Sequence, residues 1–278
     1  MKIITRNAIA WKLTQIKWML DEGLSATRIV SSFYDKRLKD RLYSEFMFRG
    51  KKEAENLGLK ISERMPPGSL HEMFYDEEYN NNEILRTLSN HSHPIIFDIG
   101  AWYGDSILYF SRKYNAEVFA FEPLPEAFSV AAENVMLNGL TETVHLQNIA
   151  ISDGYSIQGS TSGNMLSSAA INDETTPFAS QRLDDLSAKV KHCELLKIDV
   201  EGFELNVLAG AREFIKKFNP CIIVEVHSRQ IRDSVLRNLS EGRKVIEGRT
   251  RRVYKPKIIV QNLFFIPLPI EHHSHHSE

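Results

Sequence analysis

Short apolar strands alternate with amphipathic segments after residue 92, and this alternation is the feature that most constrains the fold. The apolar runs occupy residues 94–100, 116–123, 144–152, 194–202 and 221–227. Apolar residues at helical spacing mark the segments Asp105 to Tyr114, Pro125 to Asn138, Phe203 to Lys217 and Gln230 to Leu239. Nearly continuous apolar strands separated by such helices are typical of a parallel sheet covered on both faces. We therefore predict a doubly wound α/β domain.

Two stretches depart from the alternation. Residues 152–183 show no helical period, so they predict an inserted hairpin or loop instead of a crossover helix. Near the end, a candidate strand at Arg243 to Val253 is followed by the apolar run 255–269 with no helix between them. Two successive strands without a crossover helix predict a hairpin, and hence an antiparallel terminal strand at the edge of a mostly parallel sheet.

The first 90 residues have a different texture. Asn7 to Leu20 carries apolar residues at helical spacing with lysines opposite, and more helical pattern runs from Ser25 to Asn56. A stretch rich in Pro, Gly and Asn then interrupts it around residues 65–92. We predict a helical extension over residues 1–90, an α/β domain over 91–270 and a disordered His-rich tail over 271–278. The extension would cap the site, contact the acceptor or pair with a second copy of the chain.

Composition narrows the class of protein. The hydrophobic share of 42% and the charged share of 25% are ordinary for a globular chain. Cys193 and Cys221 are the only cysteines, too few for a disulfide framework, and no apolar run approaches the length of about 20 residues that a membrane span needs. We expect a cytoplasmic protein without stable membrane insertion.

Charge is unevenly distributed along the chain. The net charge is −2, yet residues 1–64 carry 14 Lys+Arg against 8 Asp+Glu, and residues 243–257 carry 7 against 1. Such segments suit an anionic partner, although solvated helix faces give the same pattern. Nucleic acid is not favoured as a partner, because we expect the basic residues from Arg243 to Lys257 to belong to an exposed hairpin near the acceptor.

The turn after the first strand has the composition of a nucleotide site. The sequence DIGAWYGDS places Asp98, Gly100 and Gly104 directly before a helix, whose free N–H groups favour negative charge. Glu122 ends the next strand, 24 positions after Asp98, where a carboxylate can accept hydrogen bonds from a ribose diol. A dinucleotide would need glycine at position 102 beside its pyrophosphate, and Trp102 opposes it. The spacing favours S-adenosylmethionine over NAD.

Six segments in this order resemble the FkbM family of class I S-adenosylmethionine-dependent methyltransferases. They are DIGAWYGDS, FAFEP, NIAISD, LDDL, LLKIDVEGFELNVLAGA and IIVEVH, between about Ile95 and Pro267. The resemblance implies a Rossmann-like fold and O-methylation of a hydroxyl on a sugar or glycan-type acceptor, with a non-sugar acceptor as the alternative. Many members have Asn where this chain has Trp102. The implied cofactor-binding residues are Asp98, Gly100, Ala101, Gly104, Asp105, Glu122, Pro123, Asn148, Ala150 and Asp199.

Candidate residues for the acceptor side follow the two later strands. Asp199 and Glu201 follow the fourth strand and His227 the fifth, at the ends where open α/β sheets bind ligands. Imidazole ordinarily titrates near neutral pH, so we predict His227 as the general base for in-line methyl transfer. Asp199 would orient the acceptor or the cofactor's amine, and Glu201 would bind sugar hydroxyls. Both carboxylates alternatively cap the following helix.

A metal site is the remaining alternative for these three residues. Asp and Glu oxygens suit a divalent cation such as Mg²⁺, which would bind a diol of the acceptor. The sequence identifies no fourth ligand, so we assign no metal ligands and do not favour a cation. The tail segment HHSHH, His272 to His276, has potential ligands, but we expect adventitious affinity there.

Overall fold

The computed structural model describes residues 52–65, 81–162, 165–167, 176–248, 251–252 and 258–269. The helix expected at Asn7 to Leu20, most of the one at Ser25 to Asn56, and the His-rich tail lie outside these residues. Pairing of the extension with a second copy therefore stays a prediction.

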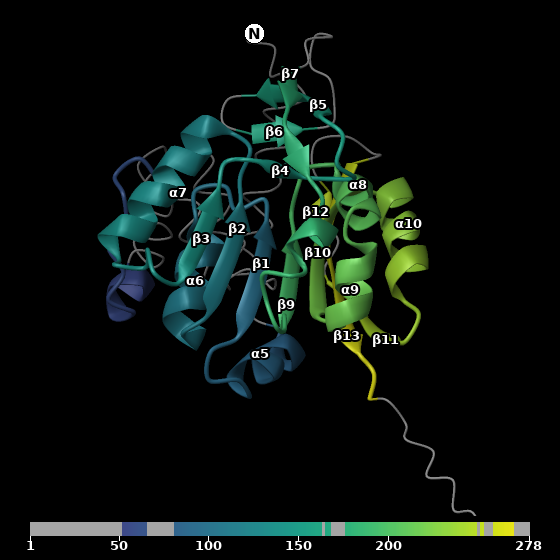
Figure 1. Ribbon diagram of the computed structural model, residues 1–278, viewed down its shortest axis with the longest axis horizontal. Coiled ribbons are helices and arrows are strands. Elements are labelled where there is room, and N and C mark those ends of the chain that lie inside the picture. Colours follow the sequence, from purple (N-terminus) through teal and green to yellow (C-terminus); the bar gives the residue numbers. More distant parts are fainter. Residues whose placement is uncertain are drawn as a thin grey trace, which may run out of the picture.

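A single large sheet organises the domain (Figure 1). Its order is β11-β13-β10-β9-β1-β2-β3, and the neighbours from β10 to β3 pair in parallel. The strands are β1 (Ile95–Ile99), β2 (Glu117–Phe121), β3 (Val144–Gln147), β9 (Leu195–Ile198), β10 (Cys221–Ser228), β11 (Arg243–Glu247), β12 (Arg251–Arg252) and β13 (Ile258–Pro267). The chain winds from β1 through β2 to β3, then returns to the other side of β1 with β9. The doubly wound sheet is confirmed.

The terminal strand is antiparallel, as predicted, but it is not at the edge. β13 pairs antiparallel with β10 on one side and with β11 on the other, so β11 is the edge strand. The inserted position buries the centre of β13, where Leu263 and Phe265 are fully buried. Gln261 and Asn262, which interrupt its apolar run, are buried as well, as expected for a strand covered on both faces.

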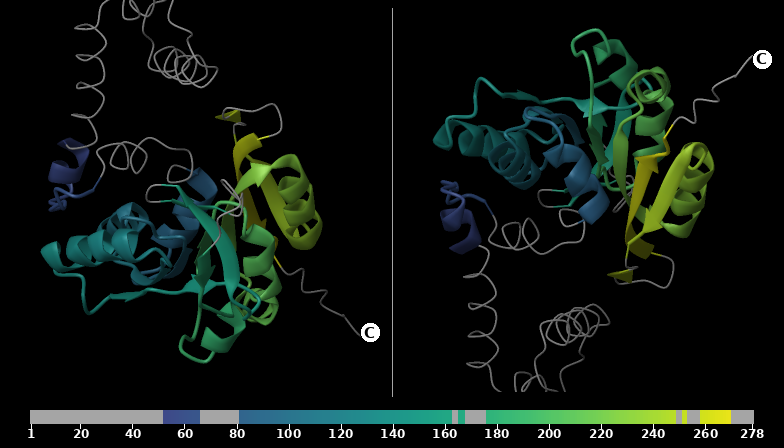
Figure 2. Two further views of the ribbon diagram at one scale, coloured as in Figure 1. Left: turned by 90° about the horizontal axis from the view of Figure 1, so that it is seen from above. Right: turned by 90° about the horizontal axis from the view of Figure 1, so that it is seen from below.

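Helices cover both faces of the sheet (Figure 2). Successive strand residues point to opposite sides, so apolar strands present apolar side chains to the helices on both faces. Ile96 of β1 packs in one cluster with α5 (Asn82–Ser89), α6 (Asp105–Tyr114) and α7 (Pro125–Leu137). Its neighbour Phe97 packs in the other with η1 (Leu183–Leu186), α8 (Glu204–Ala209), α9 (Arg212–Phe218) and α10 (Arg229–Leu239). The predicted helix at Phe203 to Lys217 is thus two helices. They part at Gly210, where a Cβ atom would stand 1.8 Å from the carbonyl oxygen of Ser152.

The insertion between β4 and η1 is built from short strands, as the missing helical period predicted. β5 (Ile157–Ser162) pairs antiparallel with β6 (Met165–Ser167) and with β7 (Thr176–Phe178). β4 (Ala150–Ile151) pairs with β8 (Ser180–Gln181). Figure 1 shows this small sheet at the top of the domain, beyond the carboxyl ends of β1, β2 and β9.

The expected break at residues 65–92 contains a helix that the sequence analysis missed. The side chain of Asn81 caps α5 by accepting the N–H groups of Glu83 and Ile84. Ile84 and Leu88 of this helix join the same apolar cluster as Leu59 and Met65. The described parts of the predicted extension therefore share a core with the α/β domain, and the division at residue 90 stays a prediction.

Neither cysteine is paired, and both are buried. Among the described residues, no helix combines the length and the apolar character needed to cross a membrane.

Gly100 offers a test of the close packing between β1 and β9. A Cβ atom there would lie 1.8 Å from the carbonyl oxygen of Asp199, and φ is +89°. Gly139 has φ of +65° with open space around its Cβ position. We expect Gly139→Ala to lower the free energy of unfolding by about 1 kcal/mol from backbone strain. Gly100→Ala should lower the free energy of unfolding by about 1–3 kcal/mol more than Gly139→Ala, because of the clash. Urea denaturation measures both values, and equal losses in the two variants would contradict this account.

Candidate active site

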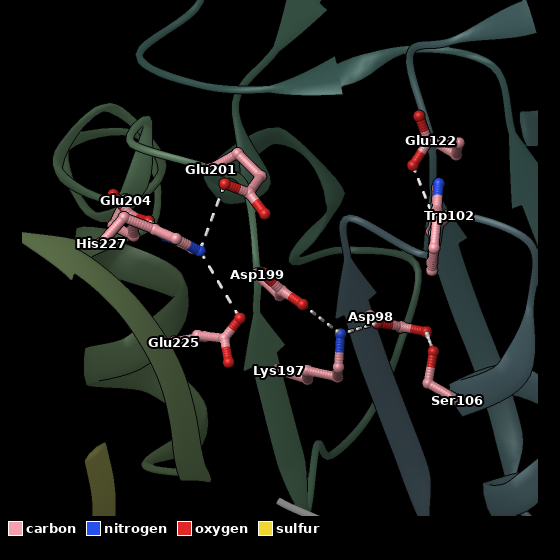
Figure 3. Close-up of polar contacts among 10 residues, drawn as sticks. All are labelled: Asp98, Trp102, Ser106, Glu122, Lys197, Asp199, Glu201, Glu204, Glu225 and His227. Atoms are coloured by element: carbon pink, nitrogen blue, oxygen red, sulfur yellow. Dashed lines mark hydrogen bonds and ion pairs between the residues drawn. The ribbon is translucent and has the colours of Figure 1, made fainter. Parts of the chain in front are cut away.

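The candidate site lies at the carboxyl ends of the central strands, where the direction of winding reverses. β1 has β2 on one side and β9 on the other, so the loops after these strands diverge there. Open α/β sheets bind ligands at such switch points. Figure 3 shows Glu122 and Trp102 on one side and His227 with its carboxylates on the other, with Lys197, Asp98 and Asp199 between them.

The loop after β1 is held by backbone hydrogen bonds to β2. The N–H groups of Gly100 and Ala101 both donate to the carbonyl of Phe121, at 3.0 and 3.1 Å. Trp102 then takes a left-handed backbone conformation with φ of 45°, which is strained for a large side chain. Gly104 begins α6 with φ of 85°, and a Cβ atom there would lie 3.2 Å from Ala131. Protein packing therefore explains both glycines of the motif.

Glu122 is the buried carboxylate of the first group. Its side chain accepts the N–H of Trp102 at 2.8 Å through one oxygen and the N–H of Leu124 at 2.9 Å through the other. The residue is only 5% exposed, and this burial raises the pKa of Glu122 to about 7 in spite of the two donors. Each oxygen keeps one further accepting position. The arrangement can accept hydrogen bonds from a diol.

Of the other residues predicted on the cofactor side, Asn148 holds a loop and three have buried side chains. Asn148 donates its side-chain amide to the carbonyls of Glu122 and Pro123, at 2.8 and 3.1 Å, and so fixes the loop after β2. The side chains of Ala101, Asp105 and Ala150 are buried. Any contact from Ala101 or Ala150 to a ligand would therefore come through the backbone.

Asp98 lies below the loop, inside the protein. It is 0% exposed; one oxygen accepts a short hydrogen bond from Ser106 of α6, and the other lies 3.3 Å from Nζ of Lys197. Burial raises the pKa of Asp98, and the lysine opposes that shift. The same Nζ lies 3.8 Å from a carboxylate oxygen of Asp199. The expectation that Asp98 lines the ligand site does not fit this burial, and we assign it a positioning role instead.

The second group surrounds His227 with carboxylates (Figure 3). Its Nδ1 lies 2.8 Å from Oε1 of Glu204, while Nε2 lies 3.3 Å from Glu201 and 3.5 Å from Glu225. Glu201, like Trp102, has a left-handed backbone conformation, with φ of 50°. The three residues predicted for the acceptor side, Asp199, Glu201 and His227, have potential ligand atoms within 4.8 Å of one another.

These surroundings bear on the predicted role of His227 as a base. Burial alone would lower the pKa of this imidazole, but hydrogen bonds to Glu201, Glu204 and Glu225 raise it far above its ordinary value. These hydrogen bonds favour the charged form of the imidazole, and the role of His227 as general base stays a prediction. The structure places His227 beside Asp199 and Glu201, as predicted.

Sequence reasoning overlooked three residues of this edge. Lys197 is a charge within the buried run LLKID, and a charge in a fully covered strand normally has a buried partner. Glu225 stands two positions before His227, so strand periodicity puts both on one face. Glu204 lies in the first turn of α8, where an acidic residue is also an ordinary complement to the helix dipole.

Comparison with known proteins gives one family. A family described as "Methyltransferase FkbM domain" matches residues 98–247, more than half of the chain. Hexuronic acid methyltransferase AglP of Haloferax volcanii is 29% identical over 161 residues, which cover 54% of this chain and 62% of AglP. Methyltransferase sdnD of Sordaria araneosa is 29% identical over 160 residues, 44% of this chain and 62% of that protein. The chain thus spans less than two thirds of the length of both relatives.

The fold has a counterpart among solved structures. The METTL16 MTase domain superposes with a TM-score of 0.51 at 12% identity, over 78% of this chain and 76% of that domain. At this identity the likeness concerns the fold, which is the Rossmann-like fold of class I methyltransferases.

Lys197 gives a prediction that concerns stability alone. Lys197→Met removes the amine and leaves the buried carboxylate of Asp98 without its cation, so we expect a loss of about 3–5 kcal/mol in unfolding free energy. The pKa of Asp98 should rise further in this variant, so the deficit should shrink as pH falls and the carboxyl becomes neutral. Urea denaturation at several pH values measures both effects.

A matched control is Lys244→Met. Lys244 pairs with Glu83 at 2.5 Å, but its side chain is half exposed, so the loss should stay below about 1 kcal/mol. Adding Asp98→Asn to Lys197→Met should recover part of the lost stability. A deficit that neither pH nor Asp98→Asn alters would show that packing alone, and not charge, explains Lys197.

Proposed function

We propose that this chain, which belongs to the FkbM methyltransferase domain family, transfers a methyl group from S-adenosylmethionine to a hydroxyl of a sugar or glycan-type acceptor. The chain is a methyltransferase by its family; the cofactor, the oxygen nucleophile and the sugar are the proposal. One observation carries it: Glu122 and the carboxylates near His227 flank the switch point of the sheet within the segment that matches the family.

The residues around Glu122 fit the nucleoside of this cofactor. A ribose has two neighbouring hydroxyls that donate hydrogen bonds, and the buried Glu122 carboxylate keeps accepting positions on both oxygens. Asn148 holds the following loop, which would lie beside the base. S-adenosylmethionine supplies a methyl group on a sulfonium, so that transfer forms an O–C bond, breaks the S–C bond with its electrons left on sulfur, and releases the hydroxyl proton.

The acceptor side needs groups that hold hydroxyls and take that proton. Asp199 and Glu201 are part-exposed carboxylates at the end of β9, and they accept hydrogen bonds from sugar hydroxyls in this proposal. One of these carboxylates receives the proton, and His227 keeps them in place through the charged hydrogen bonds that raise its own pKa. A relative named as a hexuronic acid methyltransferase supports a sugar-type acceptor.

A labelled-methyl assay tests the reaction class. The protein is incubated with S-adenosylmethionine labelled in the methyl group and with hexuronic acids, neutral hexoses, amines or RNA as acceptors. We expect label in methyl ethers of the sugars, whereas label only in methyl esters would make a carboxylate, and not a hydroxyl, the acceptor. Label only in amines or RNA would overturn the acceptor class and leave the family assignment standing. His227→Ala should lose transfer but keep cofactor binding.

The ribose contact predicts a pH dependence. The carboxylate form of Glu122 accepts both hydroxyls, and its pKa of about 7 means that protonation removes this form as pH falls. We expect the Kd for S-adenosylhomocysteine to rise by roughly tenfold between pH 8 and pH 6, and calorimetry to record this change.

Glu122→Gln is the matched control. Ionisable groups of S-adenosylhomocysteine titrate in the same way with both proteins, so a difference between the two pH profiles reports on Glu122. The variant should bind about 10–100-fold more weakly, by analogy with other hydrogen bonds to charged groups. Its pH profile should be flatter than that of the unaltered chain. Unchanged affinity in Glu122→Gln would remove Glu122 from the cofactor site.

A further inference from the structure

His227 and the carboxylates around it form a potential set of four metal ligands. Asp199, Glu201 and His227 have ligand atoms within 4.8 Å of one another, and Glu225 lies 3.5 Å from Nε2 of the same imidazole. These side chains come from the carboxyl ends of two adjacent parallel strands, β9 and β10. The fourth ligand that the sequence did not identify is therefore Glu225.

The imidazole is oriented as metal-binding histidines usually are. Nδ1 of His227 is engaged by Glu204, a carboxylate that is 0% exposed and also accepts the N–H of Gly202 at 3.0 Å. Nε2 consequently points at the other carboxylates, as Figure 3 shows. A histidine held on one nitrogen by a buried carboxylate presents the other nitrogen in a fixed direction, which is the usual outer-shell arrangement at metal centres.

A separate observation concerns a buried amide on the strand that pairs with Glu225. Asn262 of β13 is 0% exposed, and within the described residues neither its Oδ1 nor its Nδ2 has a hydrogen-bond partner. Asn262 is the direct antiparallel partner of Glu225, so both side chains lie on the same face of the sheet. A buried amide without partners costs about 1–3 kcal/mol. Water or hydroxyl oxygens bound to a cation beside Glu225 would satisfy it.

Charge favours a cation in this place. Four carboxylates, those of Glu201, Glu204, Glu225 and Asp199, lie around one imidazole. Lys197 is shared between Asp199 and the buried Asp98. A bound cation would add to the compensation that the imidazole and Lys197 already give these carboxylates.

We propose that Asp199, Glu201, Glu225 and Nε2 of His227 bind a divalent cation that holds two neighbouring oxygens of the acceptor. The acceptor role of the cation rests on the proposed function, whereas its binding does not. Three carboxylates and one imidazole suit Mn²⁺ best among common ions, because carboxylates favour Mg²⁺ and Mn²⁺ and a nitrogen ligand favours the transition metal. A cation there would orient the acceptor and lower the pKa of its hydroxyl.

Binding of Mn²⁺ to the chelator-treated full chain tests the site. Free Mn²⁺ is followed by electron paramagnetic resonance, and bound Mn²⁺ by calorimetry. We expect saturable binding that weakens by more than tenfold or so in His227→Ala and in Glu201→Gln, and by about 10–100-fold in Glu204→Gln. Glu201 is part-exposed, so Glu201→Gln still decides the matter if His227→Ala does not fold.

His145→Ala is the matched control. His145 also faces a carboxylate, Glu117 at 2.8 Å, but this pair lies on β2 and β3, away from the cluster. Its removal should leave Mn²⁺ affinity unchanged. Binding that persists in both cluster variants would place the cation elsewhere, as at His272 to His276, and would overturn the proposal.

Methyl transfer separates this proposal from the one on which it rests. Full methyl transfer by protein that is shown to be free of metal would overturn the cation site and leave the methyltransferase proposal intact. Saturable Mn²⁺ binding at the cluster in a protein that methylates no sugar would overturn the proposed sugar methylation and leave the cation site intact. Restoration of transfer by Mn²⁺, with unchanged affinity for S-adenosylhomocysteine, is the result expected if both hold.

Discussion

The amine of Lys197, buried between two carboxylates, is the interaction on which the arrangement of the site depends. It lies 3.3 Å from Asp98 on β1 and 3.8 Å from Asp199 at the end of β9, and Asp98 is tied in turn to Ser106 of α6. Each of these charges would be costly to bury alone. Together they fix the two central strands and the first crossover helix at the point where the winding of the sheet reverses. The two halves of the candidate site stand on either side of this chain of charges (Figure 3).

The backbone above Lys197 is adapted to bring the two loops close together. The Cβ position of Gly100 would lie 1.8 Å from the carbonyl oxygen of Asp199, so only glycine lets these loops approach. On each side a large residue, Trp102 or Glu201, takes a left-handed conformation that is costly for its type. In this conformation the N–H of Trp102 donates to Glu122. The side chain of Glu201, in the same conformation, faces Nε2 of His227.

The sequence was sufficient for much of the fold and for the nearness of Asp199, Glu201 and His227, while the roles of these residues stay predictions. Periodicity predicts α6 with its observed bounds, because apolar residues recur at helical spacing between Gly104 and Asn115, which cap its two ends. It misses α5, whose signal is an Asn cap within a run of Asn and Glu that resembles a loop. It also misplaces β13, because an apolar run shows that a strand is buried but not between which partners. The carboxylate surroundings of His227 could not be predicted from the sequence, because Glu204 and Glu225 reach it only through tertiary contacts.

The cation site that we propose would explain a histidine at position 227 by what the cluster needs in two states. Without a cation, the carboxylates of Glu201, Glu204 and Glu225 require a positive partner, and an imidazolium donates to them from both nitrogens. With a cation, the same ring can lose the proton on Nε2 and become a neutral ligand while Glu204 still holds Nδ1. Lysine would offer only charge, and asparagine only neutral donors and acceptors. Histidine alone can compensate the carboxylates in one state and bind beside them in the other.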